Sequence, residues 1–312
     1  MARVLIVGGC GYVGGSFTDL ALLRGHEVRV YDSLLYEDTF LKSVNFIYGD
    51  IRDETLLKKQ LKWAEVVVWL AAIVGDAACT VNPKLTYQIN VDSINFLVSN
   101  FNGRIIFPST CSVYGAQTNL LNEVSPTKPL SLYAETKLIA EEILMKSSAN
   151  VVIFRLGTLF GLSDQFARLR VDLVLNAMTI RAVKEKVISI FGGNQFRPLL
   201  HVKDVAMVGV NQLTSENTGI YNLHYRNTTI LGLAETISNL IKNVKLETQD
   251  MNIIDSRNYQ VSSQKAIDEL SFLPKISLEE GILEIKNLIV QGRIKNVENP
   301  RFNNYQKLIV SA

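Results

Sequence analysis

Residues 4–14 of this 312-residue chain read VLIVGGCGYVG, and this stretch decides the predicted fold. Its first four residues are branched and apolar, as in a buried strand, and apolar residues then recur at helical spacing from Val13 until Gly25. Glycine is needed where a chain turns sharply, where its backbone approaches a pyrophosphate and where a helix packs on a strand. Gly8, Gly11 and Gly14 fit these roles. The stretch predicts a phosphate-binding turn, and a glycine turn without a ligand is the alternative.

The sequence of an apolar strand followed by a helix continues through the first half of the chain. Amphipathic helices are expected at residues 82–100 and 132–147, and further strands at 28–31, 44–48, 66–70, 104–107 and 151–155. Continuous apolar strands that alternate with helices are typical of a parallel sheet covered on both faces. The predicted fold class is therefore α/β, with a Rossmann-type doubly wound parallel sheet.

Beyond Gly161 the pattern loosens and indicates a smaller C-terminal α/β domain. A strand is expected at residues 187–191, and helices at 168–184, 263–270 and 277–290. The segment from about residue 200 to 228 is expected to return to the large sheet. We therefore assign residues 1–160 plus about 200–228 to the first domain, and about 161–199 plus 229–312 to the second.

Composition excludes several classes of protein. The 32 basic and 30 acidic residues are spread along the chain, which argues against a nucleic-acid-binding surface. Three cysteines lie far apart and histidines number only three, so neither a disulfide framework nor a metal site is expected. The longest apolar run, residues 66–75, is well short of the roughly 20 residues that span a bilayer. We expect a cytoplasmic protein with a small-molecule partner and no membrane segment.

Two acidic residues follow predicted strands. Asp32 ends the second strand, where a carboxylate accepts hydrogen bonds from an adenosine ribose and repels a 2′-phosphate. This favours NAD over NADP as the cofactor, with a solvated loop aspartate as the alternative. Asp50 ends the third strand, within reach of an adenine edge.

A tyrosine and a lysine share one face of the helix at residues 132–147, because Tyr133 and Lys137 are four residues apart. A phenol titrates near pH ~10, so its pKa must fall by about 3 units before it acts as a base at neutral pH. A neighbouring ammonium is the direct way to lower it. We therefore expect Lys137 to lower the pKa of Tyr133 and to hydrogen-bond a nicotinamide ribose. The same pair also occurs by chance in many helices.

Several motifs in one order strengthen this interpretation. The chain resembles the extended short-chain dehydrogenase/reductase family, in its nucleotide-sugar epimerase and dehydratase branch. The resemblance rests on residues 8–14, 49–53 (GDIRD), 109–115 (STCSVYG), 133–137 (YAETK) and 191–204, which run from FGG through Arg197 to HVKD. It implies that the first domain binds NAD and the second binds a nucleotide-diphosphate sugar.

The resemblance also implies roles for individual residues. Thr110, Tyr133 and Lys137 would be catalytic, with the Thr110 hydroxyl bonded to the reacting sugar oxygen. The expected cofactor-binding residues are Gly8, Gly11, Tyr12, Val13, Gly14, Asp32, Asp50, Ile51, Leu70, Ala71, Ala72, Asn90, Ser109, Tyr133 and Lys137. The expected substrate-binding residues are Thr110, Thr158, Arg197 and Arg257, with Tyr259 a further candidate. By the same resemblance the helices at residues 82–100 and 132–147 would pair in a homodimer.

One departure from the family helps to choose among reactions. Dehydratases of this branch carry an Asp-Glu pair after the hydroxyl residue, and this chain has Cys111 and Ser112 there. The hypothesis is therefore NAD-dependent oxidation of a sugar hydroxyl at C4, by a 4-epimerase or a 4-dehydrogenase. The alternatives are a 4,6-dehydratase, another alcohol oxidoreductase of the family acting on steroids or flavonoid-like alcohols, and a non-catalytic NAD-binding regulator or structural subunit.

Overall fold

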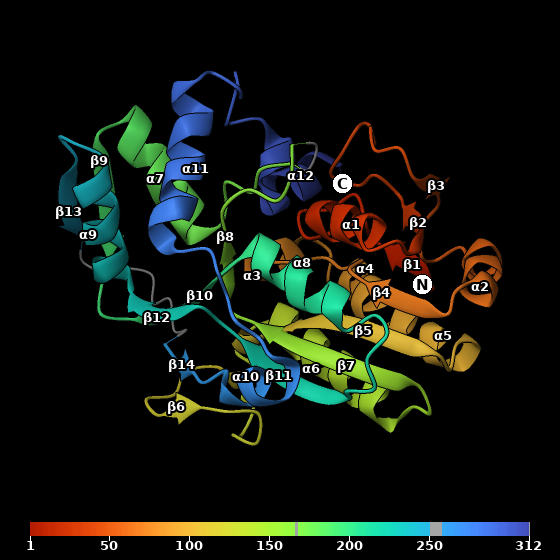
Figure 1. Cartoon of the computed structure of the whole chain (residues 1–312). Coiled ribbons are helices and arrows are strands. Elements are labelled where there is room, and N and C mark those ends of the chain that lie inside the picture. Colours follow the sequence, from red (N-terminus) through yellow and green to blue (C-terminus); the bar gives the residue numbers. More distant parts are fainter. Residues whose placement is uncertain (166–167, 250–257, 312) are drawn as a thin grey trace.

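A seven-stranded parallel sheet forms the centre of the computed structural model, which describes residues 1–165, 168–249 and 258–311 (Figure 1). Its strands follow the order β11-β7-β5-β4-β1-β2-β3. Their bounds are β1 (Arg3–Val7), β2 (Glu27–Asp32), β3 (Asn45–Tyr48), β4 (Val66–Trp69), β5 (Arg104–Thr110), β7 (Asn150–Leu156) and β11 (Gly219–Leu223). The Rossmann-type α/β prediction is confirmed, and each of the six strands expected in the first half forms.

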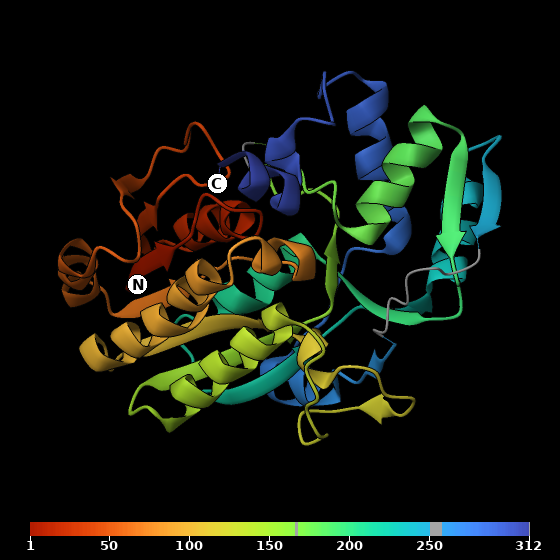
Figure 2. The same cartoon turned by 180° about the vertical axis from the view of Figure 1, so that it is seen from behind.

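Both faces of the sheet are buried because successive side chains of each strand point to opposite sides. On β1, Val4 and Ile6 join one apolar cluster, whereas Leu5 and Val7 join another. Helices α1 (Gly14–Leu23), α8 (Val202–Asn211) and α10 (Gln264–Leu270) contribute to the first cluster. Helices α2 (Glu54–Trp63), α5 (Ser93–Asn100) and α6 (Leu132–Lys146) contribute to the second, on the face turned forward in Figure 2.

A smaller region lies beside the large sheet, at the upper left of Figure 1. Strands β12-β10-β8 and β13-β9 form two small sheets, which share an apolar cluster with three helices. The bounds here are β8 (Thr158–Phe160), β9 (Val187–Phe191), β10 (Phe196–His201), β12 (Arg226–Thr229), β13 (Lys245–Gln249), α7 (Val174–Lys184), α9 (Ile230–Leu240) and α11 (Leu278–Val290). Between β10 and β12 the chain returns to the large sheet through α8 and β11.

The remaining elements are short. They are α3 (Asp76–Val81), α4 (Pro83–Tyr87), a π-helical turn (Gln88–Asp92), 3-10 turns (Cys111–Tyr114 and Pro300–Phe302), β6 (Leu120–Leu121), β14 (Gln260–Val261) and α12 (Asn304–Ser311). The helix expected at residues 82–100 is therefore interrupted by the π-helical turn. No helix among the described residues is both long and apolar enough to cross a membrane.

One predicted helix was wrong at its start. The helix expected from Arg168 begins only at Val174, after Leu173 in an extended conformation. The preceding backbone is held instead by a side chain, because the Asn176 amide donates to the carbonyl oxygen of Arg170 at 2.9 Å. Arg168 and Arg170 therefore lie before the helix and not in it, and both side chains line a pocket described below.

A buried ion pair joins α6 to strand β7 of the large sheet. Arg155 on β7 donates to the Glu141 carboxylate through Nε (3.1 Å) and Nη2 (2.7 Å), and both side chains are almost wholly buried. Ser109 on β5 donates to the same carboxylate, and Arg155 also donates to the Tyr114 hydroxyl at 2.9 Å. The carboxyl ends of β5 and β7 are thereby fixed against the helix that carries Tyr133 and Lys137.

We expect Glu141→Gln to lower the free energy of unfolding by about 3–5 kcal/mol, because it leaves the Arg155 guanidinium buried without an opposite charge. Urea unfolding at pH 7 measures this change. Glu142→Gln is the matched control, since Glu142 is the next residue on the same helix and is exposed. Equal effects of the two substitutions would contradict a role for the ion pair.

Candidate active site

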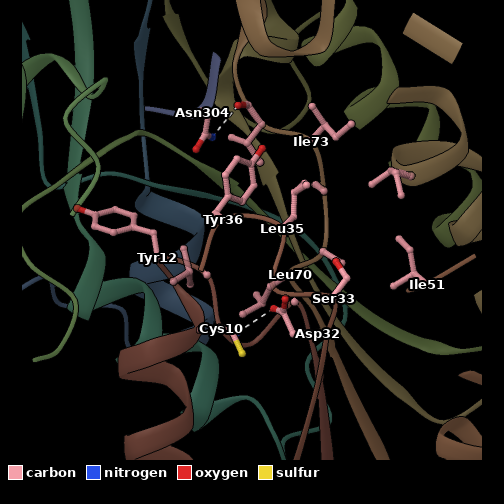
Figure 3. Close-up of a pocket in the computed structure, with 18 of the residues that line it drawn as sticks. Cys10, Tyr12, Asp32, Ser33, Leu35, Tyr36, Ile51, Leu70, Ile73 and Asn304 are labelled. Carbon is pink, nitrogen blue, oxygen red and sulfur yellow. Dashed lines mark hydrogen bonds between the residues drawn. The ribbon is translucent and has the colours of Figure 1, made fainter. Parts of the chain in front are cut away.

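A pocket of about 250 Å³ opens at the carboxyl ends of the parallel strands. Strand order reverses there, since β1 has β2 on one side and β4 on the other, and ligands of doubly wound sheets bind at such a point. The glycine turn, the ends of β2, β4 and β5, and one face of α6 line it. Figure 3 shows Cys10 of the glycine turn, Asp32 at the end of β2 and Leu70 after β4 around the pocket.

The glycine turn has the shape of a phosphate cradle. Gly8 has φ +82°, and a Cβ on it would lie 2.4 Å from the backbone nitrogen of Ala71. A Cβ on Gly14 would lie 2.2 Å from the carbonyl oxygen of Gly9. Among the hydrogen bonds of the described residues, the N–H groups of Tyr12, Val13 and Gly14 have no acceptor. These donors at the start of α1 fit the pyrophosphate of a dinucleotide.

Asp32 lies at the pocket, as predicted for a ribose-binding carboxylate. It accepts the backbone N–H groups of Cys10 (2.9 Å) and Leu34 (2.7 Å), which fix its orientation (Figure 3). Burial raises the pKa of Asp32, and these hydrogen bonds oppose the rise. Glu37 lines the same pocket. Two carboxyl groups at this end disfavour the additional phosphate of NADP.

The other expected cofactor residues divide into those that line the pocket and one that does not. Asp50 lies at the rim, where Arg52 pairs with its carboxylate at 2.6 Å and holds its pKa low. Asn90 is buried and bonds both backbone groups of Ile73, at 2.8 and 3.0 Å, so it positions the lining loop without reaching the pocket. The remaining residues predicted on the walls and found there are Ile51, Leu70, Ala71, Ala72 and Ser109.

The predicted catalytic residues come together at the end of β5 and on α6. Tyr133 and Lys137 both line the pocket, and Thr110 hydrogen-bonds Tyr133. Thr110 accepts the N–H of Ser112 at 3.1 Å, which orients its hydroxyl. Lys137 is 5% exposed, and its ammonium lies 3.8 Å from the centroid of the Phe107 ring. A proton acceptor and a cation thus share one wall, next to the strand end that carries the Thr110 hydroxyl.

The electrostatics of this pair differ from the expectation. Burial raises the pKa of Tyr133 above its usual value, and Arg170 and the hydrogen bond with Thr110 oppose the rise. Burial also lowers the pKa of Lys137 from 10.5 to about 7, with Glu141 opposing the change. The expectation that Lys137 holds the phenol pKa low was wrong for the unliganded chain, because desolvation of both groups outweighs their proximity. Negative charge in the pocket would favour the lysine cation.

Lys137→Met is expected to stabilise the folded chain in a pH-dependent way. Below pH 7 the wild-type fold bears the cost of a buried ammonium, about 1.4 kcal/mol for each unit of pKa displacement. Between pH 7 and 10.5 the unfolded chain binds more protons, so wild-type stability rises with pH. The gain in free energy of unfolding is therefore several kcal/mol at pH 6 and shrinks toward pH 10.

Urea unfolding at pH 6, 8 and 10 measures this difference. Lys146→Met at the exposed end of the same helix is the control and should show no such trend. A gain for Lys137→Met that did not change with pH would contradict the assigned cost of the buried charge.

The expected substrate residues lie apart from these walls. Thr158 and Arg197 are on the neighbouring strands β8 and β10, and neither they nor Thr110 is among the described residues lining the pocket. Arg197 is buried and donates to the carbonyl of Phe196 at 2.7 Å. The Tyr259 hydroxyl lies 3.3 Å from that of Ser112. Arg257 lies outside the described residues.

Several residues that line the pocket escaped sequence reasoning. Arg168, Arg170 and Asn304 enter from beyond the first half of the chain, and Tyr36 and Glu37 follow Asp32. Two of these residues could have been suspected from the sequence, because Arg168 and Arg170 lie within the mainly apolar stretch at residues 168–175. We interpreted that stretch as the start of a helix.

The fold and site define an α/β oxidoreductase-like protein with a dinucleotide pocket and a Tyr-Lys pair. The sequence model of the NAD dependent epimerase/dehydratase family matches residues 4–223. The chain belongs to this family, and it is an NAD-dependent enzyme of the extended short-chain dehydrogenase/reductase type. The family prediction is confirmed.

Individual relatives are distant but align along most of the chain. UDP-glucuronic acid decarboxylase 1 of Danio rerio is 25% identical over 97% of this chain and 75% of that protein. A putative UDP-glucose 4-epimerase of Methanocaldococcus jannaschii is 27% identical over 91% of this chain and 97% of that protein. The UDP-glucose 4-epimerase of Thermotoga maritima, solved with UDP-glucose, has a TM-score of 0.83 at 22% identity, covering 94% of this chain and all of that one.

Proposed function

We propose that the enzyme oxidises the C4 hydroxyl of a nucleotide-activated sugar. The observations that carry the proposal are that Tyr133 and Lys137 line the dinucleotide pocket and that Thr110 hydrogen-bonds Tyr133. NAD supplies the hydride acceptor. The Thr110 hydroxyl holds the sugar oxygen, and ionised Tyr133 accepts its proton. The positive charge of Arg170 favours that ionisation, and Lys137 hydrogen-bonds the nicotinamide ribose.

Inversion at C4 by a 4-epimerase is favoured over loss of water by a 4,6-dehydratase. Cys111 is fully buried, its thiol donates to the carbonyl of Arg155 at 3.1 Å, and burial raises its pKa. Ser112 bonds Tyr259. Neither side chain supplies the additional acid or base that loss of water requires. The relative from Methanocaldococcus jannaschii, named a putative UDP-glucose 4-epimerase, supports the same choice. The homodimer and the cytoplasmic location stay predictions.

The test is incubation of the purified enzyme with UDP-, CDP-, GDP- and dTDP-sugars, including UDP-glucuronic acid, with product analysis by NMR. Inverted sugar without net NADH supports the epimerase. Accumulated NADH indicates a 4-dehydrogenase, and a 4-keto-6-deoxy or decarboxylated sugar overturns the C4-inverting outcome. Inertness toward the whole panel, with turnover of a hydrophobic alcohol, would favour the alternative substrate class.

Tyr133→Phe should retain NAD and lose turnover by at least about 10²-fold, because it removes the proton acceptor and leaves the pocket walls in place. Enzyme activity and the nucleotide released on denaturation measure the two effects. Tyr87→Phe is the control, since that hydroxyl bonds the exposed Glu135 outside the pocket. Undiminished turnover by Tyr133→Phe would overturn the mechanism.

Arg197→Ala should raise KM for nucleotide sugars by roughly 10–100-fold, because a guanidinium donates charge-assisted hydrogen bonds to a diphosphate. Arg197→Lys should recover part of the loss, since it keeps the charge without the planar fork. The control is Arg226→Ala on the neighbouring strand β12, where the side chain is exposed. An unchanged KM for each nucleotide sugar tested would favour a substrate without a diphosphate.

A further inference from the structure

The C-terminal segment of the chain reaches the cofactor pocket. Helix α12 packs on α3, and Leu308 joins an apolar cluster with Ile73 and Cys79 beside Tyr133. At the start of α12, Asn304 lines the pocket itself. Figure 3 shows Asn304 and Tyr36 on the side of the pocket opposite Cys10 and Asp32. The segment therefore forms part of the pocket wall, facing the glycine turn.

Asn304 links three parts of the chain that are far apart in sequence. Its amide nitrogen donates to the carbonyl of Val74 at 2.8 Å, and its backbone N–H donates to Asp172 at 3.2 Å. Its amide oxygen accepts from Arg168, which also donates to the carbonyl of Arg301 at 2.9 Å. The loop after β4, the segment before α7 and the C-terminus are thus joined across the pocket.

A second set of contacts joins the C-terminal segment to the loop after β2. Arg301 forms an ion pair with Glu37, whose side chain is 6% exposed. The Arg168 guanidinium lies 4.3 Å from the centroid of the Tyr36 ring. We call these five residues, Tyr36, Glu37, Arg168, Arg301 and Asn304, the cofactor cap. Opening the pocket on this side requires breaking an ion pair and several hydrogen bonds.

The cofactor cap contains polar atoms that the described residues do not satisfy. Arg168 Nε, the Tyr36 hydroxyl and one oxygen of Glu37 are buried without a hydrogen-bond partner among the residues the structure describes. Buried polar groups are normally paired, so these atoms fit a ligand that offers both acceptors and donors. Burial lowers the pKa of Arg168 to about 10, and Arg170 beside it adds to this effect. An anion in the pocket would accept a hydrogen bond from Arg168 and would offset the cost of burying its positive charge.

We propose that the cofactor cap completes the NAD site and keeps the dinucleotide enclosed between catalytic cycles. A pyrophosphate offers acceptors to Arg168 and ribose hydroxyls offer donors to Glu37, while Asn304 and Arg301 hold these side chains over the cofactor. The inference needs only the NAD dependence of the family. The cofactor cap would also serve the proposed epimerase. An epimerase must reduce the ketosugar with the NADH that it has just formed, so the dinucleotide has to stay bound between the two steps.

The test measures the release of NAD from the purified enzyme in the absence of sugar. Its result therefore does not depend on whether the proposed reaction on a nucleotide sugar is correct. Denatured samples give the NAD content, and dilution into excess unlabelled NAD after loading with labelled NAD gives the release rate. Arg301→Gln and Asn304→Ala should each release NAD about ten-fold faster than wild type. The charge reversal Glu37→Arg with Arg301→Glu should restore slower release than either single reversal.

Lys184→Gln is the matched control. It breaks the exposed ion pair (3.1 Å) between Lys184, at the end of α7, and Glu298 of the C-terminal segment, and neither residue lines the pocket. Its NAD release should equal that of wild type, and thermal unfolding of each variant verifies the fold. Wild-type release rates in both Arg301→Gln and Asn304→Ala would overturn the proposal. The proposal would also be overturned if Lys184→Gln accelerated NAD release as much as the cap variants do. Loosening the C-terminal segment in general would then be enough to explain the faster release.

Discussion

The site depends on one close approach of two backbones, that of Gly8 at the end of β1 and that of Ala71 after β4. If Gly8 carried a Cβ atom, that atom would lie only 2.4 Å from the backbone nitrogen of Ala71, so no side chain fits at this position. The turn lines the pocket, and the N–H groups of Tyr12, Val13 and Gly14 have no acceptor among the described residues. The loop from Ala71 to Val74 also lines the pocket, and hydrogen bonds from Asn90 to Ile73 and from Asn304 to Val74 hold it in place.

Charge in this molecule is placed locally. The formal charge of the chain is only +2, yet Lys137, Arg168 and Arg170 are all buried at the pocket. Each loses hydration on folding, which is costly unless an opposite charge is near. Asp172 supplies one for Arg170 at 2.9 Å, whereas Lys137 rests on an aromatic ring. Part of the folding free energy is therefore spent on a pocket that favours anions.

The sequence predicted those parts of the site that follow strands. Gly8, Asp32, Leu70 and Ser109 stand next to the ends of apolar runs, and a parallel sheet brings such ends to one edge. Helical periodicity predicted that Tyr133 and Lys137 share one face of a helix, whereas their catalytic role followed only from the resemblance to the family. Asn90 was predicted to bind the cofactor, but its side chain does not line the pocket. It lies in the π-helical turn and bonds the backbone of Ile73, which does line the pocket.

By itself the sequence determined the α/β class, the six strands of the first half, the NAD-binding turn and the family, because these follow from local periodicity and from residues within a few positions of each other. Only the tertiary structure decided the direction of the pKa shifts, which depend on burial by distant segments. It also decided that Arg168, Arg301 and Asn304 reach the cofactor pocket. Their contacts join positions more than 100 residues apart, such as Arg168 and Asn304, and no local pattern encodes such pairing.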